Sequence, residues 1–362
     1  MAKGKFEKRA AEKRREEQAA ACGEKKKRKL VLWQKLLLIA LAVLLVLVIA
    51  VVWAADHVLG KLGSFDDLEE TNPNETVVEE FDTDSTIDGQ ETIETINAGD
   101  VTFGEVEVLE NKEIVNIMLI GQDARPGEGR SRSDSMILVT LNPKKNAIQM
   151  TSFMRDIYVQ IPGYLDNRLN VAYRYGGTEL MNETFKKNFG LQIDGNVMVD
   201  FTEFIHIIDI LGGVDIELNG EEVAYMKTYG TQSVKVGMNH LDGENALVYA
   251  RMRQVSGGDY GRTERQRKVL SSVIQSVKDT GLTGILKLVD EVLPSVVTNI
   301  SKTDIIKYVT EGVGLLANQA QIQSLRIPAD DAHYGAMIDG MSVMVADMAM
   351  CREDLNEFIY ED

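Results

Sequence analysis

An unbroken run of twenty apolar residues at positions 36–55 places the strongest constraint on how this chain can fold. At the helical rise of about 1.5 Å per residue, such a run spans the roughly 30 Å hydrocarbon core of a bilayer. Trp33 and Trp53 lie near its two ends, where aromatic rings favour the membrane interface. A cleavable signal peptide is the competing interpretation, but the run is long for one and lacks a convincing small-residue cleavage site. The sequence therefore predicts an uncleaved transmembrane helix.

Charge is divided unevenly about this run. Residues 1–35 carry a net charge of +8 and the whole chain carries −17, so the remainder carries −25. Because basic flanks stay in the cytoplasm, we expect a single-pass cell-membrane protein with a cytoplasmic N-terminal tail and an extracellular bulk. Topology alone accounts for the basic tail, so no nucleic acid partner is expected. Cys22 and Cys351 would then lie on opposite sides of the membrane and could not form an intrachain disulfide.

Two regions follow the predicted membrane helix. Residues 56–112 are dense in Asp, Glu, Thr and Asn and poor in large apolar side chains, which predicts a solvated acidic stalk. Alternating apolar residues at 91–96 and 106–109 indicate short edge strands within it. Residues 113–362 are numerous enough to form one large folded domain.

Apolar and helical patterns alternate along this domain. Short β-branched runs predict buried strands at 114–120, 136–141, 148–153, 197–201, 214–218 and 321–327. Helical patterns occupy 178–189, 202–211, 243–251, 261–280, 282–292 and 303–317. Thr303 is a candidate cap for the last of these helices. The alternation predicts a three-layer α/β/α domain with a central mixed sheet, on which the C-terminal part also packs.

Residues 250–270 concentrate positive charge in an otherwise acidic protein. The stretch ARMRQVSGGDYGRTERQRKVL contains Arg251, Arg253, Arg262, Arg265 and Arg267. A helix that begins near Gly261 would place Arg262 and Gln266 at the head of an apolar stripe. A guanidinium that faces inward needs a partner. Two interpretations stay open, an internal ion pair with a carboxylate such as Asp259, or a pocket for an oxyanion such as phosphate.

A second group of charged residues precedes the predicted strand at 136–141. Asp123 and Asp134 flank a Gly-rich, Pro-containing loop that leaves the strand at 114–120. Two carboxylates at a strand end can hold Mg²⁺ or Mn²⁺, hard cations that also bind phosphates. The alternative is that both residues cap helices or turns. Eleven of the thirteen arginines after the apolar run lie within residues 125–267, which favours an anion site with a metal.

Other reaction centres find little support in the sequence. His206, His240 and His333 are scattered without metal-ligand spacing, and Cys351 stands alone in this part of the chain. A histidine-built zinc centre and acyl transfer by a catalytic triad are therefore poor hypotheses.

Taken in order, the charged motifs resemble those of the LytR-CpsA-Psr family. The motifs are GQD (121–123), RSDS (132–135), MRD (154–156), RLNVAY (168–173), DFTEF (200–204), LGGVDI (211–216), LDGENALVYARMR (241–253) and GDYGRTERQRKVL (258–270). The motif core covers residues 115–278, and the tail with its single membrane anchor is also similar to the family's layout. The string ALVYARMR followed by GDYGRTERQR is the most specific element, whereas LGGVDI alone would be weak.

The resemblance implies a phosphotransferase of the Gram-positive envelope. Such an enzyme attaches teichoic acid, or a capsular or secondary wall polysaccharide, from an undecaprenyl-pyrophosphate carrier to the muramic acid of peptidoglycan. It also implies that Asp123 and Asp134 hold Mg²⁺ or Mn²⁺, and that Arg155 and Asp134 act in catalysis. The implied pyrophosphate-binding residues are Arg132, Arg155, Arg251, Arg253, Arg262 and Gln266. Such chemistry needs positioning and charge stabilisation rather than a protein nucleophile.

Small departures from the family pattern leave these charges in place. Met154 stands where Pro commonly precedes the Arg-Asp pair, and Arg130 competes with Arg132 for the phosphate-facing position.

Two alternative functions stay open. One is a hydrolase that cleaves the lipid pyrophosphate, and the other is a noncatalytic envelope regulator that binds polyprenyl phosphate.

Overall fold

The computed structural model describes residues 93–122, 132–292 and 296–361. The basic tail, the predicted transmembrane helix and residues 56–92 of the predicted stalk lie outside these ranges. No helix among the described residues has both the length and the apolar character needed to cross a membrane.

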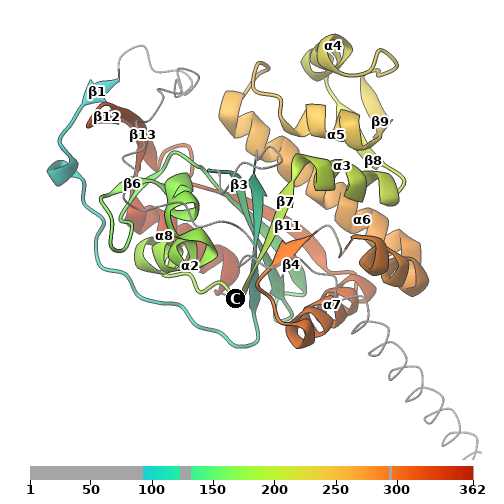
Figure 1. The fold of residues 1–362 in the computed structure, drawn as a ribbon, viewed down its shortest axis with the longest axis horizontal. Coiled ribbons are helices and arrows are strands. Elements are labelled where there is room, and N and C mark those ends of the chain that lie inside the picture. The colour runs from blue at the N-terminus through green and yellow to red at the C-terminus, as the bar shows by residue number, and fades with distance from the viewer. Residues whose placement is uncertain (1–92, 123–131, 293–295, 362) are drawn as a thin grey trace, which may run out of the picture. The chain divides into compact units, whose positions relative to one another are not determined.

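A six-stranded sheet forms the centre of the domain (Figure 1). Its strands, in spatial order, are β10 (Val297–Thr298), β7 (Gly195–Asp200), β2 (Val115–Gln122), β3 (Ser133–Asn142), β4 (Ala147–Phe153) and β11 (Gln321–Ile327). β2 runs parallel to β7 and β4 runs parallel to β11, while the other neighbours are antiparallel. The predicted α/β fold with a central mixed sheet is therefore confirmed.

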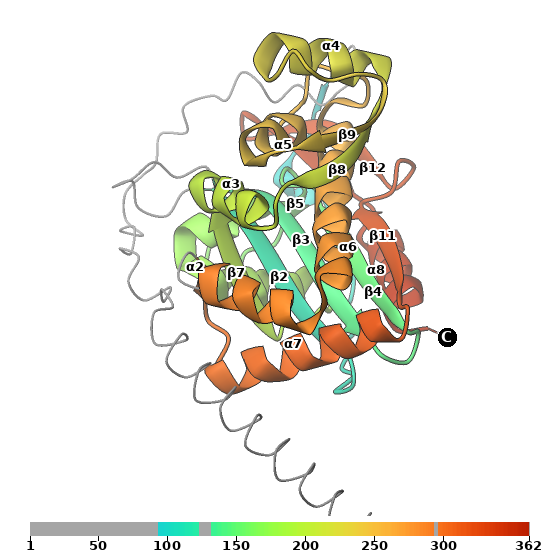
Figure 2. The ribbon, with the colours of Figure 1, turned by 90° about the vertical axis from the view of Figure 1, so that its right-hand side faces the viewer.

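Helices cover both faces of this sheet. The α2 (Leu169–Phe189) and α8 (Met348–Ile359) helices lie on one face, and α6 (Gly258–Val292) and α7 (Lys302–Ala317) lie on the other (Figure 2). On the first face Phe153 packs edge-on against Phe185, with ring centroids 4.8 Å apart. On the second face Ile148 packs in a cluster with Ile274 and Leu315. The strands carry apolar side chains on both faces because each face is buried.

A smaller unit of structure extends from the N-terminal half of α6. It contains α3 (Phe201–Ile210), β8 (Val214–Leu218), α4 (Gly220–Tyr229), β9 (Gly237–Leu241) and α5 (Gly243–Ala250). Its apolar cluster includes Tyr249, Met252 and, from α6, Val269. The side chains of Asp200, Asn219 and Asp242 accept backbone hydrogen bonds at the starts of α3, α4 and α5. This packing brings the segment after α5 beside the beginning of α6.

The C-terminal part packs on the central sheet through β11 and α8, as predicted. It also adds a feature that was not predicted, because β12 (His333–Ile338) and β13 (Met341–Ala346) form a separate sheet with β1 (Glu94–Thr95). β1 runs parallel to β12, and Phe103 packs against the domain core. Part of the segment assigned to the stalk is therefore folded, because its few apolar residues find partners in β12 and β13. A 3₁₀ turn at Ala98–Asp100 and the short strands β5 (Tyr158–Val159) and β6 (Asn167–Arg168) complete the described elements.

Several helix boundaries differ from those predicted. α6 is continuous where two helices were expected, and α2 begins at Leu169 because Gly176 and Gly177 kink the helix instead of preceding it. The cap of α7 is Ser301 rather than Thr303, since the Ser301 side chain accepts a hydrogen bond from the Asp304 backbone. α4 was not predicted, although its capping box of Asn219 and Glu222 is visible in the sequence.

Candidate functional site

The site lies at the end of the central sheet where β3 begins and β4 ends. In the antiparallel register of these strands Met136 pairs with Phe153. Two residues beyond that pair, Asp134 and Arg155 are therefore brought to the same end of the sheet. Arg155 Nη1 donates to Asp134 Oδ1 at 2.8 Å. The sheet register thus joins two motifs that lie twenty-one residues apart in the sequence.

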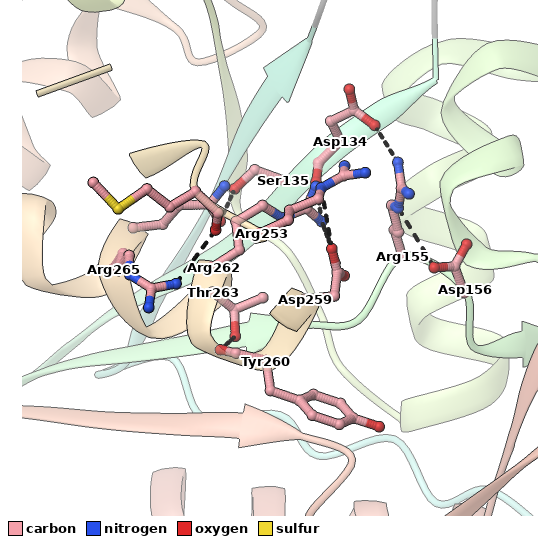
Figure 3. A network of polar contacts seen from close by, with 12 residues as sticks. Asp134, Ser135, Arg155, Asp156, Arg253, Asp259, Tyr260, Arg262, Thr263 and Arg265 are labelled. Carbon is pink, nitrogen blue, oxygen red and sulfur yellow. Dashed lines mark hydrogen bonds and ion pairs between the residues drawn. The ribbon is translucent and has the colours of Figure 1, made fainter. Parts of the chain in front are cut away.

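Arg155 is held from two sides by carboxylates (Figure 3). Its residue exposure is 7 %, and its Nε lies 3.4 Å from Asp156 Oδ2. Asp156 Oδ1 lies in turn 3.5 Å from Nη1 of Arg168, the residue before α2. Burial on its own would lower the pKa of Arg155, but the charges of Asp156, Asp259 and Asp134 outweigh it and raise the pKa. Arg155 is therefore a fixed, permanently charged group at this end of the sheet.

The beginning of α6 supplies a second half of the network. Asp259 Oδ1 lies 3.4 Å from Arg253 Nε and 3.0 Å from Arg262 Nη2. Arg262 Nη2 also donates to the backbone carbonyl of Asp134, at 3.4 Å. Burial lowers the pKa of Arg262 to about 10, with Arg253 and Arg155 acting in the same direction against the charge of Asp259. α6 and β3 are thus joined through one buried guanidinium.

Gln266 lies one turn after Arg262 and faces the same strand. Its Oε1 accepts a hydrogen bond from Ser135 Oγ at 3.1 Å. Residues four apart on a helix share a face, so the sequence spacing already placed Arg262 and Gln266 together. The structure shows that this face of α6 meets β3.

The other predicted site residues lie differently. Arg251 caps the end of α5, and its guanidinium stacks over the Phe201 ring at 4.3 Å from the centroid. Arg132 precedes β3, partly buried, and makes no hydrogen bond or ion pair within the ranges that the structure describes. Asp123, the predicted second metal carboxylate, lies outside those ranges, as does Arg130. The structure therefore gathers Asp134, Arg155, Arg253, Arg262 and Gln266 into one network.

Sequence reasoning missed Arg168 as a member of this network. It lies in the RLNVAY motif, and the signal was its position directly before a helix beside the Arg-Asp pair. Asp259 was foreseen as an ion-pair partner, and the structure shows that pairing with both Arg253 and Arg262.

The network combines fixed positive charge with access from solvent. The side chains of Asp134, Arg253 and Asp259 are 32 %, 32 % and 27 % exposed, whereas those of Arg155 and Arg262 are 8 % and 5 % exposed. An anion that reaches the exposed atoms can replace a carboxylate as the partner of the guanidiniums. Phosphate groups suit such a site because arginine donors match their oxygens in pairs.

The donor atoms of the site decide which kind of metal it could hold. No group of three or more His, Cys, Asp or Glu side chains among the described residues is placed to hold a metal ion. Asp134 offers a partly exposed carboxylate next to the arginines. Mg²⁺ commonly binds through one or two carboxylates and completes its coordination with water and substrate phosphates. The donor set at Asp134 therefore fits a metal that binds together with a phosphate ligand, and does not fit a cage made by protein alone.

Comparison with known proteins agrees with the motif order and the fold. The LytR_cpsA_psr family model matches residues 75–357, which is most of the chain. The chain belongs to the LytR-CpsA-Psr family.

Individual relatives show how far the similarity extends. The polyisoprenyl-teichoic acid–peptidoglycan teichoic acid transferase TagU of Bacillus anthracis is 34 % identical over 227 residues, which are 62 % of this chain and 72 % of TagU. The crystal structure of TagT from B. subtilis superposes with a TM-score of 0.56 at 26 % identity, covering 74 % of this chain and 99 % of TagT. A structure of TagT with bound octaprenyl pyrophosphate lipid superposes with a TM-score of 0.53 at 25 % identity, covering 72 % and 95 %. This LytR-CpsA-Psr protein thus shares its mixed α/β fold with those solved structures.

Proposed function

We propose that this protein is a phosphotransferase that attaches an anionic glycopolymer, such as teichoic acid or a capsular or secondary wall polysaccharide, to peptidoglycan. Its donor would be a glycopolymer linked to undecaprenyl pyrophosphate, and its acceptor a muramic acid hydroxyl. TagU is named as a transferase of this kind, and TagT has been solved with a polyprenyl pyrophosphate. The observation that carries the proposal is the network of Arg155, Arg253 and Arg262 around partly exposed carboxylates.

In the proposed reaction the acceptor oxygen attacks the phosphorus next to the sugar. A new oxygen–phosphorus bond forms to the glycan, and the bond between that phosphorus and the departing polyprenyl phosphate breaks. The hydroxyl proton passes to solvent water as the oxygen attacks, and the polyprenyl phosphate leaves with the electron pair of the broken bond. No covalent intermediate with the protein is needed.

Three arginines of the network have a defined part in this proposal. Negative charge spreads over the nonbridging oxygens of the pyrophosphate, so fixed guanidinium donors stabilise the transition state. Asp134 and Asp156 orient the fork of Arg155 from two sides, which supports this part for Arg155. Arg253 and Arg262 bind the pyrophosphate by exchanging Asp259 for phosphate oxygens. Arg132, Arg251 and Gln266 remain proposed pyrophosphate-binding residues on the family pattern.

The proposal includes a metal at Asp134. We infer that Asp134, together with Asp123, holds Mg²⁺ or Mn²⁺ when the donor is bound. The metal would neutralise phosphate charge at the site. Chelation of divalent cations should then abolish transfer and leave the melting temperature of the donor-free protein unchanged, because the described fold has no metal cage of its own.

The proposed substrates also predict where in the cell the protein acts. A donor on a polyprenyl carrier and an acceptor in peptidoglycan meet at the outer face of the cell membrane. The apolar run at 36–55 would anchor the chain there, with its basic tail in the cytoplasm and the folded domain outside. Membrane lipid would then be a further partner, and DNA would not.

A transfer assay tests the function. The full chain in detergent is incubated with a polyprenyl-pyrophosphate-linked saccharide, Mg²⁺ and peptidoglycan oligomers, and mass spectrometry follows the sugar phosphate. The expected product is a saccharide joined to the glycan through a phosphodiester. Arg155→Ala and Asp134→Ala should lose this product while retaining a cooperative unfolding transition. Lys144→Ala is the matched control, because Lys144 lies at the β3–β4 turn in an exposed pair with Glu113.

The assay also separates the alternatives. Free sugar phosphate without a glycan adduct would overturn the transferase in favour of a hydrolase. A donor that copurifies unchanged would overturn it in favour of a noncatalytic binding protein.

A further inference from the structure

Arg267 lies on a different face of α6 from the network described above. Tyr260, Arg267 and Ile274 follow one another at intervals of seven residues, so they share one side of the helix. Ile274 packs on the central sheet in the same cluster as Ile148 of β4. Arg267 therefore faces the sheet, two turns nearer the beginning of α6. The Tyr260 ring points away from the Arg253 and Arg262 side chains (Figure 3).

The sheet beneath Arg267 presents a hydroxyl and a second guanidinium. Ser152 lies four residues after Ile148 and so shares its face of β4. In the parallel register of β4 with β11, Ser152 pairs with Arg326. α6 contacts both strands, so Arg267 lies over the face of the sheet that carries Ser152 and Arg326.

Arg326 is held in place by its surroundings. Its guanidinium lies over the Tyr260 ring at 4.4 Å from the centroid. Its Nε donates to the Pro328 carbonyl at 3.2 Å, and Nη2 forms an ion pair with Asp330. The Asp330 side chain is 85 % exposed, so this pairing is open to solvent. Arg326 is thus a positioned cation whose charge is only partly compensated.

Arg267, by contrast, has no hydrogen bond or ion pair within the described residues. Its Nη1 is buried without an acceptor, and so is Ser152 Oγ. The nearby carboxylate of Glu264 is engaged by Lys268 at 2.8 Å. Burial lowers the pKa of Arg267, and the positive charge of Arg326 lowers it further. Two guanidiniums of like charge and two residues with unsatisfied polar atoms are therefore gathered on one face of the sheet.

We propose that Arg267, Arg326 and Ser152 form a second anion site that takes a phosphate-type oxyanion. Such an anion accepts hydrogen bonds from both guanidiniums and from the hydroxyl, and its charge removes their repulsion. The site is distinct from the Arg155 network because Arg267 and Arg262 lie about 140° apart around α6. The oxyanion is either free phosphate or a phosphodiester of the transferred polymer, and the second source rests on the proposed function.

Calorimetric titration of the full chain with inorganic phosphate tests the site. The wild type should bind two phosphates, and Arg155→Ala should retain one. Arg267→Gln and Ser152→Ala should weaken this second phosphate, the former at least about tenfold, which corresponds to about 1.4 kcal/mol. Lys187→Gln is the matched control, since Lys187 is exposed on α2, which covers the opposite face of the sheet. Removing a cation from a like-charge pair is not expected to unfold the protein, and a melting curve for each variant checks this.

Unchanged stoichiometry and affinity in both Arg267→Gln and Ser152→Ala would overturn the proposal. Loss of both phosphates in folded Arg267→Gln would overturn it as well, because it would make Arg267 part of the Arg155 network. These results do not depend on transfer, so they stand even if the proposed function fails.

A second measurement identifies the source of the phosphate. Transfer by Arg267→Gln is compared for a donor whose saccharide lacks phosphate and one that carries several phosphodiesters. An increased KM for the second donor alone supports the polymer as ligand and overturns free phosphate. If KM changes equally for both donors, or for neither, the polymer is not the ligand. The oxyanion is then free phosphate.

Discussion

Arg262 and Arg265 lie one turn apart on α6 and are equally buried, yet their surroundings differ. Each is 4 % exposed. Arg265 Nε donates to Glu222 Oε1 at 2.9 Å, and its other two nitrogens donate to the carbonyls of Met252 and Ser256 at 3.3 and 3.2 Å. Every nitrogen of this guanidinium therefore has an acceptor, and the Glu222 side chain is only 4 % exposed. Arg265 joins α6, α4 and the segment after α5.

Arg262 is less completely satisfied. Its partners are the partly exposed Asp259 carboxylate and the Asp134 carbonyl, and its Nε is buried without an acceptor. The difference distinguishes an arginine whose donors are all used from one with spare donors in the same helix. A guanidinium with all its donors used inside the protein stabilises the fold, whereas one with donors to spare beside solvent can bind an anion.

The largest effect on stability is expected when the buried ion pair of Arg265 and Glu222 is broken. Arg265→Met leaves the Glu222 carboxylate buried without its cation, which should lower the free energy of unfolding by about 3 to 5 kcal/mol. Urea denaturation followed by circular dichroism measures the change. Replacing both partners, as Arg265→Met with Glu222→Leu, should recover much of the loss, because no charge is then left unpaired. If the double variant is no more stable than the single one, the contact is not a buried ion pair of this kind.

In contrast to Arg265→Met, Arg262→Lys should reduce the rate of transfer much more than the stability of the fold. Lysine keeps the positive charge beside Asp259 but loses the planar fork that pairs with phosphate oxygens. We expect transfer to fall roughly tenfold to a hundredfold, with the unfolding midpoint nearly unchanged. Initial rates in the transfer assay, with a thermal melt beside them, make the comparison. A large loss of stability with normal rates would place Arg262 in the same class as Arg265.

Asp259→Asn probes the exchange between carboxylate and phosphate. Asp259 offsets the charge of Arg253 and Arg262 in the free protein, so its neutralisation should raise the affinity for inorganic pyrophosphate about tenfold. Isothermal titration measures the affinity. Asp215→Asn is the control, since Asp215 bonds His240 at the surface of the smaller unit. Weaker pyrophosphate binding by Asp259→Asn would show that the carboxylate orients the arginines rather than competing for them.

The sequence predicted the parts of the molecule that follow a local rule. Strands such as β8 and β11 have the predicted bounds because their apolar residues are contiguous and turns flank them. Arg262 and Gln266 were placed on one face because helical spacing is local. The pairing of Arg155 with Asp134 depends instead on the register of β3 and β4, which motif order can suggest only through the resemblance to a family.

Long-range packing accounts for the other differences. The separate sheet of β1, β12 and β13 unites segments from opposite ends of the domain, and no local pattern encodes that pairing. Likewise Arg265 and Arg267 are equivalent in the sequence, as two arginines of one basic run. Arg265 has an acceptor for every donor because Glu222 on α4 lies beside it. Arg267 instead lies near the like charge of Arg326 on β11 and is unpaired within the described structure.

The smallest effect on transfer is expected for the hydrogen bond between Ser135 and Gln266, which is a neutral contact beside the charged network. Ser135→Ala removes the hydroxyl that donates to Gln266 Oε1, leaving a partly buried amide with a lost hydrogen bond. A neutral hydrogen bond contributes about 1 kcal/mol, so KM for the donor should rise about fivefold with kcat almost constant. Steady-state kinetics at varied donor concentration separate the two constants. If kcat falls and KM does not change, Gln266 acts on the transferring phosphorus, and the boundary between binding and catalysis lies at α6 rather than at Arg155.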